Sequence, residues 1–431
     1  MLRRQFQVLK RNFPRFIFQD KREVKSSGSC WRLSAITLLA CSIAVLCAVR
    51  TGYAGVLGDT IKPFASITEM YDSNIFRVRD KDQLLAINGG NQMGDFITIL
   101  SAGTDVHYEI SKQIANLMIR KDFLRYINYT DQNASRDEAK ADVTLAVIDR
   151  FRIKMLGSYD KTPVPRTDYQ SSGLNKSTDT NGGITVQYEM PTGITLEAAY
   201  GRHDVRYSLE EFKANEYSSD QYSATASYRI STETRLYSTL QREYTRYKEE
   251  QLLGFDQINN NSVSDSVRIG IEKTVGAKTA VSAYIGYLTR QHKEASERDF
   301  SGIIGKVEVT YGLTAKLGLL VNAERLLYEE IDPNRTYSVT DSVGAGLIYE
   351  ITEKTKVRLF DKYSWKYFKN IPDTEVIKRT DHIQEISAGV QWLPIKAVTV
   401  DVAYQYASRG STDDTLRYKD HTAMASVAYH F

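Results

Sequence analysis

Cysteine is nearly absent from this 431-residue sequence, and the three that occur, Cys30, Cys41 and Cys47, all lie close to its start. Everything after residue 47 therefore lacks the groups for a disulfide, a thiolate metal site or a cysteine nucleophile. Long apolar runs are scarce as well. After residue 61 no run is long enough for a transmembrane helix.

The usual sequence patterns of catalysis and ligand binding are also missing. There is no Walker loop and no dinucleotide fingerprint. The serine in "LGSYD" (156–160) lacks the second glycine of a nucleophile elbow. Six histidines show no metal-ligand spacing with carboxylates: His107, His203, His292, His382, His421 and His430. We therefore expect no enzyme, no cofactor, and no catalytic, cofactor-binding or metal site.

The start of the chain has the layout of an export signal. Residues 1–32 carry nine Lys or Arg and two acids, and an uncharged apolar run of 17 residues follows at 33–49. Gly52 and Ala54 then stand at the −3 and −1 positions of a plausible cleavage site. This layout predicts a signal peptide over 1–54, the general secretory route and a short segment at 55–60. A single transmembrane helix is the alternative.

Removing residues 1–54 changes the charge of the protein. They hold 10 of the 56 Lys and Arg and 2 of the 53 acids, which leaves 46 basic and 51 acidic residues, a net charge of about −5. The formal +3 thus belongs to the leader, and nothing in the remainder favours binding to nucleic acid.

From residue 61 onward the sequence alternates with a period of two. In "VTVDVAYQY" (398–406) the valines and tyrosines take one face and Thr399, Asp401, Ala403 and Gln405 take the other. Such strands come in pairs joined by tight turns, and longer polar stretches separate the pairs. This predicts an all-β fold over 61–431: an antiparallel, transmembrane, up-and-down β-barrel of about 18 strands. The strand number near 138–162 is open, and a soluble all-β protein is the alternative.

The strand ends and the last strand support a barrel in the Gram-negative outer membrane. Aromatic residues crowd the strand ends near the tight turns, as expected at a membrane interface. Val427, Tyr429 and Phe431 form the apolar face of the last strand, a signal that we expect the barrel-assembly machinery to read. Pairing of the first and last strands would leave no open edge.

The predicted inner face is small, polar and charged. A hydrated, salt-bridged lumen is one interpretation, and a set of contacts for a sliding hydrophilic polymer is the other. Tyr237, Tyr284 and Phe360 are predicted to face inward as well. The charged lumen candidates are Glu189, Glu197, Arg229, Arg235, Arg268, Glu272, Lys306, Glu308, Glu350, Arg358 and Lys362.

Two stretches carry a family resemblance: "ASITEMYDSNIFRVRD" (65–80) and "GDFITILSAGTDVHYE" (94–109). The sequence resembles the opening of the putative beta-barrel porin 2 family, with Ala102 where that pattern usually has proline. The matching residues are Tyr71, Asp72, Asn74, Ile75, Phe76, Asp95, Phe96, Ile97, Thr98 and Gly103. The resemblance implies a wide outer-membrane barrel that forms the exit for an exopolysaccharide, coupled to a periplasmic polysaccharide-export protein.

Three functions remain open at this stage. The exit for a secreted exopolysaccharide is the first. A general diffusion porin for small hydrophilic solutes is the second, and it should fold a long loop into the lumen, for which 72–94 and 162–182 are the candidates. A non-transporting surface barrel with partner-binding loops is the third, and it should fill its lumen with bulky side chains.

Overall fold

The computed structural model describes residues 60–167, 173–253, 256–276, 278–294, 296–330, 335–370 and 378–431. The predicted signal peptide and residues 55–59 lie outside the described residues. None of the helices in the described part of the chain has the length and apolar character needed to cross a membrane.

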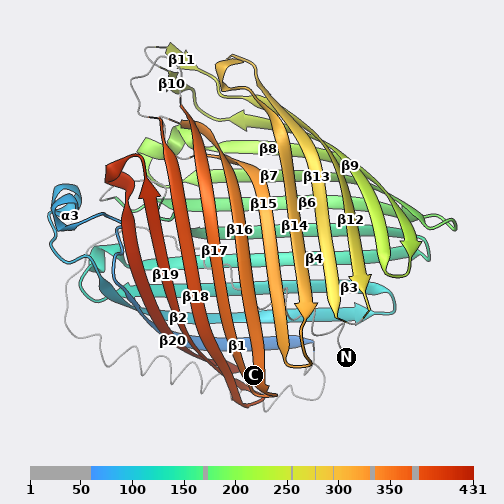
Figure 1. Cartoon of the computed structure of the whole chain (residues 1–431), viewed down its shortest axis with the longest axis horizontal. Helices are drawn as coiled ribbons and strands as arrows, with labels where there is room; N and C mark the ends of the chain where they lie inside the picture. The colour runs from blue at the N-terminus through green and yellow to red at the C-terminus, as the bar shows by residue number, and fades with distance from the viewer. Residues whose placement is uncertain are drawn as a thin grey trace.

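Eighteen strands form one antiparallel sheet in which each strand pairs with its neighbours along the chain (Figure 1). They are β1 (Ile61–Asp72), β2 (Asp95–Ile110), β3 (Gln113–Tyr126), β4 (Ala134–Ile148), β5 (Phe151–Pro163), β6 (Lys176–Glu189), β7 (Ile194–Tyr207), β8 (Tyr217–Ser231), β9 (Thr234–Tyr247), β12 (Ser262–Val275), β13 (Thr279–His292), β14 (Phe300–Gly312), β15 (Leu317–Glu329), β16 (Arg335–Thr352), β17 (Thr355–Asn370), β18 (Thr380–Ile395), β19 (Val398–Ser411) and β20 (Tyr418–His430). The region 138–162 therefore contributes two strands, β4 and β5.

The first strand closes the sheet into a barrel. β1 pairs with β2 on one side and with β20 on the other, in register from Phe64 opposite His430 to Asp72 opposite Thr422. The backbone N–H of Phe431 donates to the carbonyl of Pro63 at 2.9 Å. Every strand of this sheet thus has two neighbours, which confirms the predicted 18-stranded, closed, up-and-down barrel.

Short and long connections alternate, as the sequence predicts. Eight connections at one end have two to four residues, and the longer ones all lie at the other end. Two stretches predicted as plain loops contain regular structure. The β1–β2 connection holds the helix α3 (Lys81–Asn88), and the β9–β12 connection holds a small hairpin of β10 (Gln251–Leu253) and β11 (Asp256–Ile258). Short 3₁₀ turns occur in four more long connections: η1 (Thr130–Gln132), η2 (Glu210–Asn215), η3 (Ser296–Arg298) and η4 (Asp414–Leu416).

The two faces of the wall differ in chemistry because side chains alternate along each strand. Large apolar residues such as Val267, Ile269 and Ile285 are about half exposed on the outer face. Aromatic residues lie on the same face near the short turns: Tyr188, Tyr228, Tyr311, Tyr349 and Trp392. An apolar outer band with aromatic edges is the lipid-facing surface of a transmembrane barrel.

Candidate functional site

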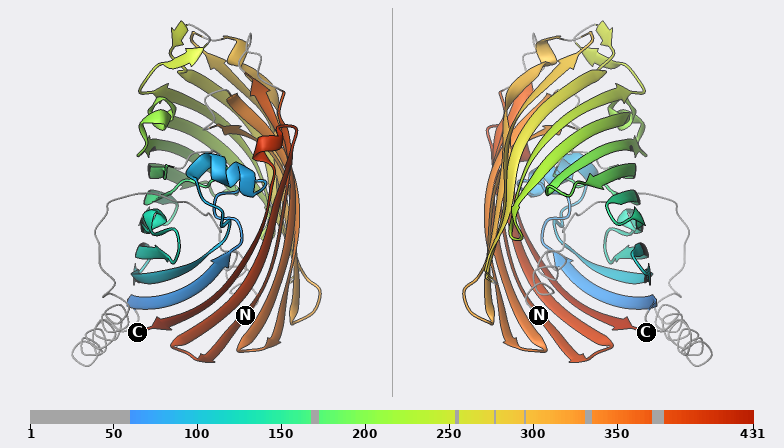
Figure 2. Two further views of the ribbon diagram at one scale, coloured as in Figure 1. Left: turned by 90° about the vertical axis from the view of Figure 1, so that its left-hand side faces the viewer. Right: turned by 90° about the vertical axis from the view of Figure 1, so that its right-hand side faces the viewer.

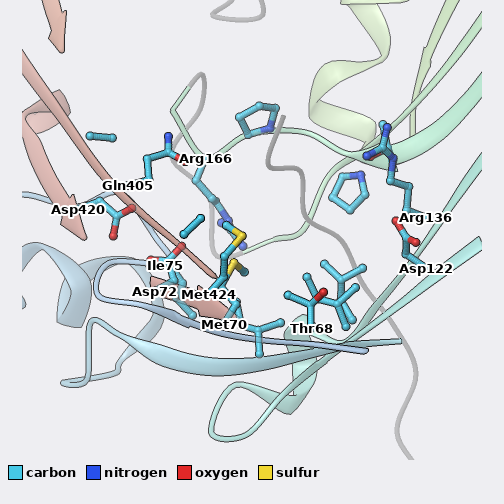
Figure 3. A pocket seen from close by; sticks show the side chains of 18 of the residues that line it. Thr68, Met70, Asp72, Ile75, Asp122, Arg136, Arg166, Gln405, Asp420 and Met424 are labelled. Atoms are coloured by element: carbon cyan, nitrogen blue, oxygen red, sulfur yellow. The ribbon is translucent and has the colours of Figure 1, made fainter. Parts of the chain in front are cut away.

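A cavity of about 650 Å³ lies inside the barrel, between the walls formed by β1–β5 and β17–β20. Side chains from distant parts of the chain line it. Figure 3 shows Asp72, Met70 and Met424 together on one part of its border, with Arg166 beside them, and Asp122 and Arg136 on another part. The cavity identifies the inner face of the wall, from which the strand register assigns the other inward positions.

The β1–β2 connection folds into the barrel mouth at the end with the long connections. Figure 2 shows this connection and α3 across the opening framed by the strands, and Figure 1 shows α3 beyond the strand ends. Phe76, Val78 and Leu84 are buried together in an apolar cluster, with Tyr129 packed against it. Asp80 caps α3 by accepting from the backbone N–H of Gln83. The cluster is therefore built by the β1–β2 connection itself together with Tyr129 of the β3–β4 connection.

A buried ion-pair group holds this connection to the wall. The Arg77 guanidinium binds both oxygens of Asp72 at 2.9 Å and reaches Asp420 of β20 at 3.2 Å. The three side chains are 8%, 4% and 2% exposed. Burial alone would lower the pKa of Arg77, but the charges of Asp72 and Asp420 outweigh it and raise that pKa above its ordinary value. Arg77 also has a φ of 53°, a strained backbone that these contacts stabilise. We call Asp72, Arg77 and Asp420 the latch.

Two further motif residues fix the same connection through backbone groups. The Asn74 side-chain amide donates to the carbonyls of Val78 at 2.7 Å and Lys419 at 3.0 Å. The fully buried Asp95 carboxylate accepts from the backbone N–H groups of Asn128 and Tyr129. The motif therefore ties the β1–β2 connection to β20 and to the β3–β4 connection.

The start of the β5–β6 connection also enters the lumen. Val164 is buried, and Arg166 donates to the side chain of Gln132 at 2.8 Å while its guanidinium lies 5.0 Å from the Phe76 ring centre. The carbonyl of Thr167 accepts from Arg409 of β19. Residues 164–167 therefore link β5 to β19, six strands away around the barrel, and narrow the mouth together with the latch.

The remaining motif residues have structural roles that the sequence does not reveal. The rings of Tyr71 and Phe96 contact each other at 4.9 Å, and the Phe76 ring meets that of Tyr129 edge-on at 4.9 Å. The Thr98 hydroxyl donates to Glu69. Ile75 packs on the apolar cluster and Ile97 is buried in the cavity wall. Gly103 lies directly under the Phe64 ring.

The structure places the eleven charged lumen candidates on the inward side of the strands, where most of them contact an opposite charge. Arg268 instead lies 5.7 Å from the centre of the Tyr284 ring. The pairs are Glu189–Arg229 (3.0 Å), Glu197–Arg235 (3.2 Å), Glu272–Arg235 (3.6 Å), Lys306–Glu308 (3.9 Å), Glu350–Lys356 (2.7 Å), Arg358–Asp401 (2.5 Å) and Lys362–Glu324 (3.4 Å).

The inward aromatic rings lie along the wall. A Cβ atom added to Gly270 would come within 2.3 Å of the Tyr237 ring, and one added to Gly344 would come within 3.0 Å of the Phe360 ring. These rings therefore cover glycines of the adjacent strand. The lumen keeps its width, and the wall still presents aromatic surface.

Sequence reasoning missed the residues that narrow the mouth: Arg77, Arg166, Arg409 and Asp420. Arg77 had a local signal, since it directly follows the motif residues Asn74, Ile75 and Phe76. The other three had none, because their partners lie up to 343 positions away in the chain. In the described part of the chain, no group of three or more His, Cys, Asp or Glu side chains is arranged to hold a metal ion.

Replacing Asp95 by alanine is expected to loosen the mouth. The substitution leaves several backbone N–H groups without their acceptor, at a cost of about 1–3 kcal/mol for each buried donor. Limited proteolysis should then cut the β1–β2 and β3–β4 connections faster than in the wild type. Asp82→Ala, an exposed acid in the first turn of α3, is the control and should leave the cleavage rate unchanged.

Three solved structures are similar to the barrel. The barrel resembles OpdK with vanillate from Pseudomonas aeruginosa (12% identity, TM-score 0.47, 88% of this chain and 100% of that one). It also resembles OccAB3 from Acinetobacter baumannii (10% identity, TM-score 0.46, 87% of this chain and 99% of that one). A third similar structure is the FrpB iron transporter from Neisseria meningitidis (9% identity, TM-score 0.46, 81% of this chain). This chain spans 62% of the length of that transporter. No curated protein matches the sequence.

The family comparison covers almost the whole barrel. The model of the family described as "putative beta-barrel porin 2" matches residues 57–431. This range includes all eighteen strands and the motif at the mouth. The chain belongs to the putative beta-barrel porin 2 family.

Proposed function

We propose that this porin-like outer-membrane channel is the exit for a secreted exopolysaccharide. The polymer would pass through a hydrated lumen, held by weak and distributed contacts. A barrel of 16–18 strands is wide enough to leave an aqueous channel, and an extended polysaccharide needs such a width.

The observation that carries the proposal is the chemistry of the inner wall. Its charges are paired, as in Lys362–Glu324 and Arg235–Glu197, and its aromatic rings lie over glycines of the adjacent strand. Ion pairs that solvent reaches contribute only about 0–1 kcal/mol, so hydroxyl groups of a passing sugar can replace them at little cost. Aromatic rings offer faces on which sugars stack.

The channel would have two protein partners, one during transport and one during assembly. We propose that a periplasmic polysaccharide-export protein delivers the polymer to the end with the short turns. We also propose that the barrel-assembly machinery reads the outward side chains of Val427, Tyr429 and Phe431. Tyr429 and Phe431 form a partly exposed pair with ring centres 4.7 Å apart, which supports this assignment. In this scheme the latch and α3 limit leakage until polymer enters.

A second function, diffusion of small hydrophilic solutes, is favoured by one specific observation. Parts of both candidate loops, 73–94 and 164–167, fold into the barrel mouth. An inward loop is the feature expected of a diffusion porin, because it sets the size of solute that passes.

Deleting the coding sequence and restoring it distinguishes the two functions. The export proposal predicts that extracellular polysaccharide falls on deletion and returns with the wild-type chain, while uptake of small solutes stays unchanged. Tyr237→Ala with Phe360→Ala should restore it only in part, whereas Tyr222→Ala, a control on the outer face, should restore it fully. Unchanged polysaccharide with reduced solute uptake would refute export and establish the diffusion porin.

A further inference from the structure

A group of lysines lies on the outer face of the barrel, near the end with the long connections. Lys121 of β3 pairs in register with Asp137 of β4, which pairs in turn with Lys161 of β5. Lys161 stands opposite Thr178, two residues from Lys176 on β6. Adjacent residues such as Asp122 line the cavity, so these side chains point away from the lumen. We call Lys121, Lys161 and Lys176 the lysine cluster.

The positive charge of this cluster is only partly balanced. Asp137 forms an ion pair with Lys121, and no ion pair is formed by Lys161 or Lys176 within the described residues. Arg125 adds a further exposed cation four residues beyond Lys121 on the same face. The three lysines of the cluster thus have one carboxylate, Asp137, in register with two of them, an arrangement that an anion would stabilise.

The height of the cluster matches the edge of the bilayer. On the outer face of β5 the residues from Phe151 to Tyr159 form an apolar and aromatic band that ends at Lys161. Ten residues of a strand tilted by about 45° rise roughly 23 Å, close to the height of about 25 Å for a lipid-facing band. The lysines therefore stand at the level of the lipid headgroups.

Two other outer-face arginines at this end of the barrel are each paired with a carboxylate of the protein. Arg242 binds both oxygens of Asp265 at 2.7 Å, and Arg325 binds Asp341 at 2.9 Å. The surplus charge over β3–β6 therefore stands apart from these paired positions. Within a bilayer, the partner that reaches such a site is a lipid headgroup.

We propose that Lys121, Lys161 and Lys176 bind the phosphate groups of a phosphorylated glycolipid in the outer leaflet. Lysine provides a compact charge on a flexible stem, and the stems lie along the apolar wall while the ammonium groups reach upward. Two phosphates on one lipid can contact separate lysines of the cluster. Such a bound lipid would anchor the wall beneath the inward-folded connections.

The test uses the full-length protein purified from membranes, with bisphosphorylated lipid A as the probe and native mass spectrometry as the readout. Replacing all three lysines by glutamine should weaken lipid binding roughly 10- to 100-fold, given the contribution of each lysine near an anionic surface. Dephosphorylated lipid A should bind the wild type as weakly. Heat-dependent gel migration reports whether each variant is folded.

A matched control removes the same charge elsewhere. Lys273→Gln, Lys278→Gln and Lys396→Gln together neutralise three exposed lysines at the short-turn end and should leave lipid binding unchanged. Equal binding of both lipids, or wild-type binding by the lysine-cluster variant, would overturn the proposal. Tight binding of inorganic phosphate alone at the cluster would also overturn it, in favour of a soluble anion.

Discussion

Replacing Arg77 by alanine is expected to release the β1–β2 connection and to raise the conductance of the channel. Arg77 contacts both Asp72 and Asp420 in a group that is more than nine-tenths buried. Removing one partner of a buried ion pair costs about 3–5 kcal/mol, because the remaining charge stays buried without compensation. Here two carboxylates would face each other. A cost of that size changes the ratio of closed to open mouths by roughly 10²- to 10³-fold.

Single-channel recording in planar bilayers measures this effect, and sensitivity of cells to a bulky hydrophilic antibiotic measures it in vivo. Arg79→Ala is the matched control. Arg79 lies two residues further on, is half exposed and pairs with Asp80, and such a surface pair contributes at most about 1 kcal/mol. Arg77→Lys should fall between the two, since lysine keeps the charge but not the two-point contact. Wild-type conductance in Arg77→Ala would show that the latch does not control the mouth.

The strands were predictable because one physical rule acts on every one of them. In a bilayer each backbone group must be paired within the sheet, and each strand must present one face to lipid and the other to water. That requirement leaves a period of two in the sequence, seen in residues 398–406. The alternation of short and long connections follows from the same geometry. Closure of the barrel by β1 and β20 is then the arrangement that leaves no edge.

The narrowing of the mouth was not predictable, because no periodic rule governs it. Arg409 donates to Thr167, 242 positions away, and Asn74 donates to Lys419, 345 positions away. These contacts depend on the finished barrel bringing β5, β19 and β20 to one place. The motif made Asp72 and Asn74 stand out as a pattern, and only the structure reveals that they hold a connection inside the lumen. Helix α3 was missed because eight residues give little periodic signal.

Replacing Gly103 by valine is expected to reduce the fraction of folded barrel more strongly than any other glycine substitution we propose. A Cβ atom at Gly103 would lie 2.5 Å from the carbonyl oxygen of Ile119 and 2.6 Å from the Phe64 ring. The first atom belongs to the backbone of β3 and cannot move without breaking the strand pairing. Overpacking of this kind costs about 1–3 kcal/mol, occasionally more.

The position of Phe64 makes this collision costly for closure. Phe64 pairs with Gly103 on one side and with His430 of the last strand on the other, so displacing its ring disturbs both pairings of β1. Heat-dependent gel migration measures the folded fraction. Gly182→Val is the control, because a Cβ atom there meets nothing within 4 Å and valine favours strands. When Phe64→Ala is added to Gly103→Ala, it should restore folding only in part, because the added Cβ atom still meets the carbonyl oxygen of Ile119. Equal folded fractions of Gly103→Val and Gly182→Val would contradict this prediction. They would show that barrel closure does not depend on the glycine at position 103 or on the position of the Phe64 ring.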